Sequence, residues 1–265
     1  ALDTDVQSWL TRVASASGTV SAGTQSAVNT FVLAAKANGY FSKFRRINLF
    51  CGDAAASLVP LVNTSGGTTD TNNSTTYAEA TGRVGGGTAY LDTGYTPTQA
   101  VGGHSVYLRT TQASAATVRI PVGVRNTDSS QVFRIAGNSN GEGVTTAGAV
   151  NASWGNLITV GTPQANTTGG LVAALWHYIR TSSTSGKLYK NGVEVGSMTS
   201  AISHASPGFA FYVFANNGAG TANAFLEASS AIGAVAFDDG TMTGTHAANY
   251  YTDVQAFQTA LSRQV

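Results

Sequence analysis

The stretch Leu188-Tyr189-Lys190-Asn191-Gly192-Val193-Glu194-Val195 decides the fold class of this chain. Asn191 and Gly192 at its centre predict a type I′ hairpin turn, because both central residues of that turn need a positive φ, which Asn tolerates and Gly adopts freely. In this register Tyr189 pairs with Glu194 and Leu188 with Val195. An apolar, aromatic run from Leu171 to Thr181 precedes the hairpin and predicts a buried strand.

Further short strand signals, separated by Gly, Asn and Ser turns, cover much of the remaining chain. They lie at Ala89–Asp92, Ser105–Thr110, Thr117–Val124, Gln131–Ala136, Leu157–Val160, Phe209–Ala215 and Ala231–Phe237. Many short strands without an intervening helix predict an antiparallel sandwich or jelly roll rather than a parallel α/β sheet. A chain of 265 residues is long enough to form one such domain.

The two ends of the chain show helical periodicity instead. Thr4 and Gln7 form a capping pair for a first helix, Ser21 caps a second helix that Gly39 ends, and Thr243 caps a third. The apolar faces of the first two helices contain Trp9, Val13, Phe31 and Val32. We therefore expect a mainly β chain in two parts: a helical docking and assembly segment over residues 1–60, and a jelly roll over residues 61–265, closed by a helix over residues 244–262.

Charge and cysteine content exclude several classes of function. Charged residues make up 10% of the chain, against about 25% in an average soluble domain. A net charge of +1 gives no long-range attraction for nucleic acid or an anionic membrane, and no apolar run approaches the roughly 18 residues of a membrane-spanning helix. Cys51 is the single cysteine, which excludes an intramolecular disulfide framework.

Several of these segments together resemble a known family. The hairpin, the segment Phe211-Tyr212-Val213-Phe214-Ala215-Asn216-Asn217, Ile232-Gly233 and the Thr-capped terminal helix resemble the back half of a concanavalin A-like (laminin-G-like) jelly roll. Thr88-Ala89-Tyr90-Leu91-Asp92-Thr93-Gly94 resembles the opening strand of the same fold. The region from Val20 to Leu61 is similar to a leader in uncharacterised proteins of phages and environmental bacteria. The resemblance implies a fold shared by lectins, glycosidases, lyases and structural modules.

The acidic residues do not form the carboxylate pattern that glycosidases of this fold family carry, Glu-x-Asp-x-x-Glu. Asp238 and Asp239 are adjacent, so a strand would point them to opposite faces, and turn chemistry before the last helix is their expected role. His177 and Arg180 supply residue types that polysaccharide lyases use, but the lyase signatures are absent. No sequence motif for a metal site is present. We expect neither enzymatic activity nor a cofactor.

Candidate binding residues lie in segments with the composition of loops. Trp154 in the segment 151–156, with Asn138 and Asn140, could contact a glycan; packing in the core is the alternative for Trp154. Asp128 and Glu142 are candidate calcium ligands, with Asx-rich turns that bind no metal as the alternative.

These features and the resemblance favour a non-enzymatic structural, decoration or adhesion component on the surface of a phage virion. We expect it to form a homo-oligomer or to contact other virion subunits through Trp9, Val13, Phe31 and Val32, and to contact cell-surface polysaccharide through its loops. The alternative is a secreted or cell-surface, lectin-like carbohydrate-binding domain. A polysaccharide-active enzyme is the third interpretation.

Overall fold

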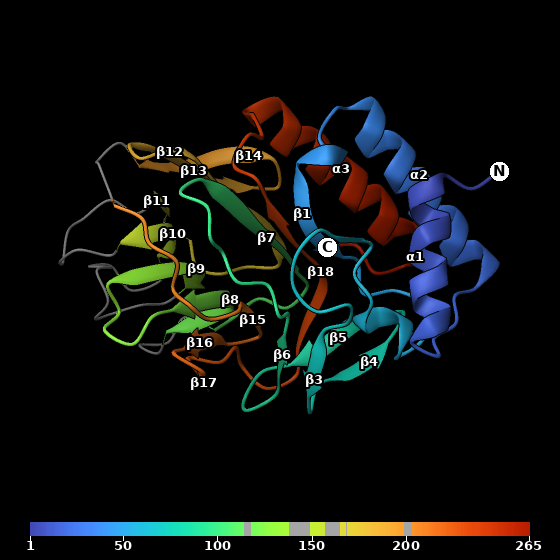
Figure 1. Ribbon diagram of the computed structural model, residues 1–265, viewed down its shortest axis with the longest axis horizontal. Helices are drawn as coiled ribbons and strands as arrows, with labels where there is room; N and C mark the ends of the chain where they lie inside the picture. The colour runs from blue at the N-terminus through green and yellow to red at the C-terminus, as the bar shows by residue number, and fades with distance from the viewer. Residues whose placement is uncertain (114–117, 138–148, 157–164, 168, 199–202) are drawn as a thin grey trace.

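The computed structural model describes the chain except for residues 114–117, 138–148, 157–164, 168 and 199–202. Its strands form two sheets that pack face to face, and three helices gather on one side of the sandwich (Figure 1). This confirms the β-sandwich with helices at both ends that the sequence predicts.

Sheet A lies between the helices and the other sheet. Its strands follow the order β14-β13-β12-β7-β18-β1-β2, with β5 beside β18 and β4 beside β5. They are β1 (Phe44–Asn48), β2 (Val62–Asn63), β4 (Thr76–Ala78), β5 (Gly82–Gly85), β7 (Gly102–Leu108), β12 (Ala174–Ser182), β13 (Ser185–Lys190), β14 (Val193–Met198) and β18 (Ser230–Asp238).

Sheet B forms the other layer, in the order β11-β10-β9-β8-β15-β6-β3, with β16 beside β8 and β17 beside β16. Its strands are β3 (Thr71–Asn73), β6 (Tyr90–Asp92), β8 (Arg119–Arg125), β9 (Gln131–Gly137), β10 (Val150–Asn156), β11 (Ala165–Thr167), β15 (Tyr212–Val213), β16 (Asn216–Gly218) and β17 (Thr221–Asn223). Among the described strands of this sheet, β8 and β16 run parallel and the other pairs are antiparallel.

The helices begin at side chains that accept backbone hydrogen bonds. The helix α1 (Thr4–Ser15) follows Asp3, whose carboxylate accepts from the backbone N–H of Asp5, so Asp3 rather than Thr4 is the cap. Ser21 caps α2 (Ala22–Ala37), and Thr243 caps α3 (Gly244–Ala260) in a capping box with His246, as the sequence predicts for both Ser21 and Thr243. Two short 3₁₀ turns, η1 (Phe41–Lys43) and η2 (Ala56–Leu58), flank β1. Within the described residues, no helix has the length and hydropathy of a membrane-spanning segment.

The apolar faces of the helices pack on the outer face of sheet A. Trp9, Val13 and Phe31 are 2% exposed and Val32 is fully buried, in one cluster with Ile47, Leu175 and Tyr250. The Trp9 indole N–H also donates to the carbonyl of Val59 at 3.0 Å. The prediction that Trp9, Val13, Phe31 and Val32 contact another subunit is therefore wrong, because this chain's own sheet covers them.

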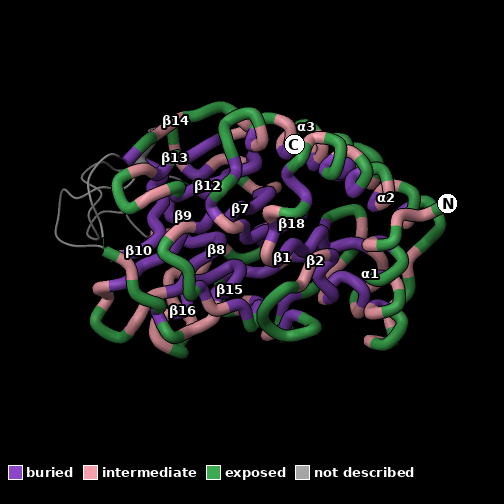
Figure 2. The backbone as a smooth tube through the Cα atoms, turned by 45° about the horizontal axis from the view of Figure 1, so that its top comes forward, coloured by how far each residue is buried: buried purple, intermediate pink, exposed green. Residues whose placement is uncertain are grey.

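The N-terminal sixty residues also supply part of the sandwich. Ile47 of β1 pairs with Ala236 of β18 and with Val62 of β2, so the expected boundary at residue 60 falls between hydrogen-bonded strands. The backbone of β1, β7 and β18 is mostly buried at the centre of the molecule (Figure 2). The second apolar cluster fills the space between the sheets.

The decisive hairpin forms with one change of register. Asn191 and Gly192 have φ values of 51° and 76°, which confirms the expected turn, and Tyr189 pairs with Glu194. A bulge after Leu188 places that residue opposite Gly196 instead of Val195.

Candidate functional site

The outer face of sheet B is not covered by the helices (Figure 1), and a row of register partners crosses this sheet. Thr71, Asp92, Tyr212, Gly123 and Arg134 are successive register partners across β3, β6, β15, β8 and β9. The neighbouring residues Leu91 and Val213 are fully buried between the sheets. Because successive residues of a strand face opposite sides, Asp92 and Tyr212 belong to the outer face.

Three aromatic rings gather beside this row. The rings of Tyr90 and Tyr212 stack with centroids 4.6 Å apart and an interplanar angle of 29°, and the ring of Phe225 lies 6.2 Å from that of Tyr90. Tyr212 is 7% exposed, whereas Tyr90 and Phe225 are half-buried. We call Tyr90, Asp92, Tyr212 and Phe225 the Tyr90 platform, because Tyr90 forms the accessible part of the stack.

The platform combines an apolar surface with a charged acceptor. Asp92 is half-buried, and one of its carboxylate oxygens accepts from the backbone N–H of Gly94 at 2.9 Å. Burial, followed by the negative charge of Asp92 and the contact with Tyr90, raises the pKa of Tyr212 to about 12. Tyr212 is therefore a neutral hydroxyl at physiological pH.

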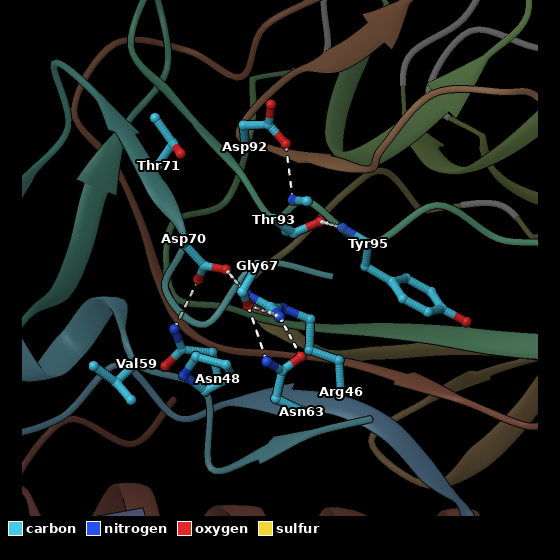
Figure 3. Close-up of polar contacts among 12 residues, drawn as sticks. Arg46, Asn48, Val59, Asn63, Gly67, Asp70, Thr71, Asp92, Thr93 and Tyr95 are labelled. Carbon is cyan, nitrogen blue, oxygen red and sulfur yellow. Dashed lines mark hydrogen bonds and ion pairs between the residues drawn. The ribbon is translucent and has the colours of Figure 1, made fainter. Parts of the chain in front are cut away.

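A buried polar network fixes the edge strand of the platform (Figure 3). Asp70, the residue before β3, is 3% exposed and forms an ion pair with Arg46 of β1, which is 1% exposed. The Asn48 amide donates to the other oxygen of Asp70 at 2.8 Å. These contacts join sheet A to the start of β3, and so they position Thr71 beside Asp92.

The turn after Asp92 is held by the same network. Gly94 has a φ of +64°, and a Cβ there would lie 2.8 Å from the backbone nitrogen of Gly67. The carbonyl of Gly67 in turn accepts from Arg46 at 2.8 Å. On the other side of the turn, the Thr93 hydroxyl donates to the carbonyl of Phe211, the residue before Tyr212, at 2.8 Å. The backbone that carries the platform is thus tied to the sandwich at both ends of the turn.

The structure does not place Trp154 where a glycan could reach it. Trp154 is fully buried in β10, its indole N–H donates to the carbonyl of Gln99 at 3.1 Å, and its ring packs on His104 and Phe133. The loop expected for residues 151–156 is a strand in which Val150, Ala152 and Trp154 alternate inward. Core packing, the alternative interpretation, is confirmed for Trp154.

The other candidate ligands are not brought together with the platform. Asn138, Asn140, Glu142 and the strand expected at residues 157–160 lie outside the described residues. Asp128 lies on the exposed β8–β9 hairpin, where the backbone N–H of Ser130 donates to it at 2.9 Å and lowers its pKa. Within the part of the chain that the structure describes, no group of three or more His, Cys, Asp and Glu side chains could hold a metal ion.

The adjacent aspartates before α3 are used as turn residues. Asp238 accepts from the backbone N–H of Gly240 at 2.8 Å and Asp239 accepts from that of Thr241 at 2.9 Å, as expected. Asp238 also lies 2.9 Å from Nε2 of His177, and both side chains are only 2% exposed. The ring of Tyr250 packs on His177 with centroids 5.5 Å apart, so α3 covers this pair.

The sequence contains a signal for the platform in a strand and not in a loop. Tyr90 and Asp92 alternate with Leu91 inside a predicted strand, which puts an aromatic ring and a carboxylate on one face. Tyr212 and Phe225 are more than 100 residues further along the chain, and only the folded sheet brings them to Tyr90.

Comparison with models of protein families and with curated proteins found no match. Solved structures do match. Domain 4 of AbnA, a GH43 extracellular arabinanase from Geobacillus stearothermophilus solved in complex with arabinotriose, aligns with 78% of this chain and 98% of that domain, at a TM-score of 0.54 and 14% identity. The Trypanosoma rangeli sialidase aligns with 86% of this chain but only 38% of its own, at a TM-score of 0.49 and 8% identity. At these identities the likeness to the arabinanase domain shows the fold alone.

Proposed function

We propose that this protein is a non-catalytic carbohydrate-binding domain of lectin-like, concanavalin A-like type, and that the Tyr90 platform is its binding site. The observation that carries the proposal is the half-buried Tyr90, stacked on Tyr212 with the Asp92 carboxylate on the same face. The C–H groups of a sugar ring pack on the face of an aromatic ring, and its hydroxyl groups donate to a carboxylate. Such a combination of apolar surface and few polar groups is typical of ligand sites.

The fold supports this proposal. A sandwich of the same architecture, domain 4 of the arabinanase, was solved in complex with arabinotriose. That ligand belongs to the arabinanase domain, and for this chain it is a reason to test oligosaccharides first. We propose a secreted or cell-surface location with it, where such a domain would meet cell-wall and extracellular polysaccharides.

A role in a phage particle stays a prediction. Its physical support was the set of apolar helix residues expected to contact another subunit, and these residues are covered by sheet A of the same chain. The partly exposed rings of Tyr90 and Phe225 on the Tyr90 platform favour the carbohydrate-binding alternative.

The test is affinity electrophoresis of the protein in gels that contain one soluble polysaccharide each, followed by calorimetry with oligosaccharides of the retained type. We expect retention by at least one polysaccharide, and about tenfold weaker binding for Tyr90→Ala, which removes the stacking surface. Tyr251→Ala removes a half-buried ring from α3, on the other side of the molecule, and is the matched control. A parent protein that no glycan retains, or a Tyr90→Ala variant that binds like the parent, would disprove the proposal.

A further inference from the structure

The basic residues of this protein are distributed unevenly between its two sides. All four lysines lie on elements of the helix and sheet A side, at Lys36 in α2, Lys43 in η1, and Lys187 and Lys190 in β13. The described strands of sheet B contain three arginines and no lysine. The sequence has no Lys or Arg between residues 201 and 240, which include β15, β16 and β17.

The three arginines of sheet B are already engaged or buried. Arg119 lies 3.8 Å from the Glu227 carboxylate and donates to the carbonyl of Phe225 at 3.3 Å. Arg125 donates to the Ser129 hydroxyl at 2.7 Å. Arg134 is 1% exposed. Recognition of a sugar carboxylate commonly uses a bidentate guanidinium group with two available N–H donors, and these arginines do not offer one at the surface of the platform.

The charge that the platform does present is negative. One carboxylate oxygen of Asp92 accepts a hydrogen bond from the backbone N–H of Gly94, and the other oxygen points away from the turn at Gly94 (Figure 3). A carboxylate in this position accepts hydrogen bonds from the hydroxyl groups of a bound sugar, and it repels a ligand carboxylate at the same distance.

Building on the proposed function, we propose that the Tyr90 platform selects uncharged glycans and rejects chains of uronic or sialic acids. Aromatic stacking provides contact with any sugar ring, so the selection comes from Asp92 and from the Glu227 carboxylate that holds Arg119. The two carboxylates act differently. Asp92 faces the ligand, whereas Glu227 holds Arg119, which also donates to the carbonyl of Phe225.

The experiment compares retention of the same protein by neutral arabinan and β-glucan and by acidic polygalacturonate and polysialic acid, at low salt, where charge effects are largest. We expect the parent to be retained by a neutral chain and to pass through both acidic gels unretarded. Asp92→Asn should weaken neutral binding about fivefold and reduce the discrimination against acidic chains, because one repulsive charge is removed. Glu227→Gln should increase retention by the acidic chains, because it releases Arg119.

Asp128→Asn is the control, since it makes the same change of charge on the exposed β8–β9 hairpin. A parent that binds acidic chains as well as neutral ones overturns the inference and leaves carbohydrate binding intact. A parent that binds neither kind overturns the proposed function, and the inference with it. If Asp92→Asn behaves like Asp128→Asn toward both kinds of chain, the selection does not come from Asp92.

Discussion

The outer faces of the two sheets have opposite chemistry although the sheets belong to one sandwich. The outer face of sheet A presents apolar side chains such as Ile47, Leu175 and Ile179, and α1, α2 and α3 bury them. The outer face of sheet B carries the exposed Thr71 and the half-buried Asp92 beside the stacked rings of Tyr90 and Tyr212, and the helices do not cover it (Figure 1). The difference shows that the helices bury the apolar outer face of sheet A, whereas the partly exposed polar and aromatic groups that we propose for binding lie on the opposite layer.

The largest effect expected from this comparison is on the covered face. Trp9→Ala should lower the free energy of unfolding by about 3–5 kcal/mol, because it removes a buried ring from between α1 and the sandwich. Urea unfolding measures the change, and Asn73→Ala on β3 of sheet B is the control, with an expected loss of less than about 1 kcal/mol. Equal losses for the two variants would contradict the division of roles between the two faces.

A second test concerns the hairpin that rests on α3. Gly192→Val should cost about 2–3 kcal/mol, because a β-branched residue resists the φ of +76° and its Cβ would lie 2.8 Å from the Cα of Ala248. Val193→Thr, at the neighbouring position that is 66% exposed, should leave the melting temperature nearly unchanged. A Gly192→Val variant that melts like the parent would mean that the hairpin does not contact the helix in this way.

The stability of the protein should depend on pH through His104, which is buried in the core between the sheets. Burial lowers the pKa of His104 to about 3, so the folded state favours the neutral ring, whereas the unfolded chain binds a proton near pH 6.5. Above pH 6.5 the ring is neutral in both states, and the free energy of unfolding does not depend on its titration. As the pH falls from 6.5 toward 3, the unfolded chain binds a proton that the folded state does not, so the free energy of unfolding should fall by about 1.4 kcal/mol per pH unit. Urea unfolding of the parent and of His104→Phe at several pH values between 7 and 4 isolates this contribution. Parallel pH profiles for the two proteins would show that His104 titrates normally.

The smallest effect on stability is expected at the platform itself. Tyr90→Ala should cost about 1 kcal/mol, because the ring is half-buried and its loss opens no internal cavity. Thermal unfolding measures this beside the binding assay. A loss as large as that of Trp9→Ala would identify Tyr90 as a core residue and remove the argument for a binding surface.

Sequence patterns predicted a helix, strand or turn correctly where one face of the element is apolar and where capping or turn residues mark its ends. The Asn191-Gly192 turn, the Ser21 and Thr243 caps and the strand at β18 are such cases. The same patterns did not predict strands in which polar residues are buried. The strand β1 contains Arg46 and Asn48, which have the polarity of surface residues. They are buried because Asp70, more than 20 residues away, forms an ion pair with Arg46 and accepts a hydrogen bond from Asn48. The strand β10 resembled a loop because Asn151 and Ser153 alternate with its inward residues.

The candidate site depends on contacts that no local pattern contains. The outward direction of Tyr90 and Asp92 follows from alternation with Leu91, but the stack with Tyr212 requires β15 to lie beside β6. Burial of the predicted assembly residues could not be foreseen either, because an amphipathic helix looks the same whether a partner subunit or its own sheet covers it.

The pairing of β1 with β18 also has a consequence for how the protein is made. Ile47 cannot reach its partner Ala236 until the intervening chain has been synthesised, which takes on the order of ten seconds or more at ordinary rates of translation. During that time the apolar side chains of α1, α2 and β1 have no completed sheet to cover them. The nascent protein should therefore depend on holding chaperones until β18 has left the ribosome, and its yield in cells should be more sensitive to chaperone supply than its equilibrium stability suggests.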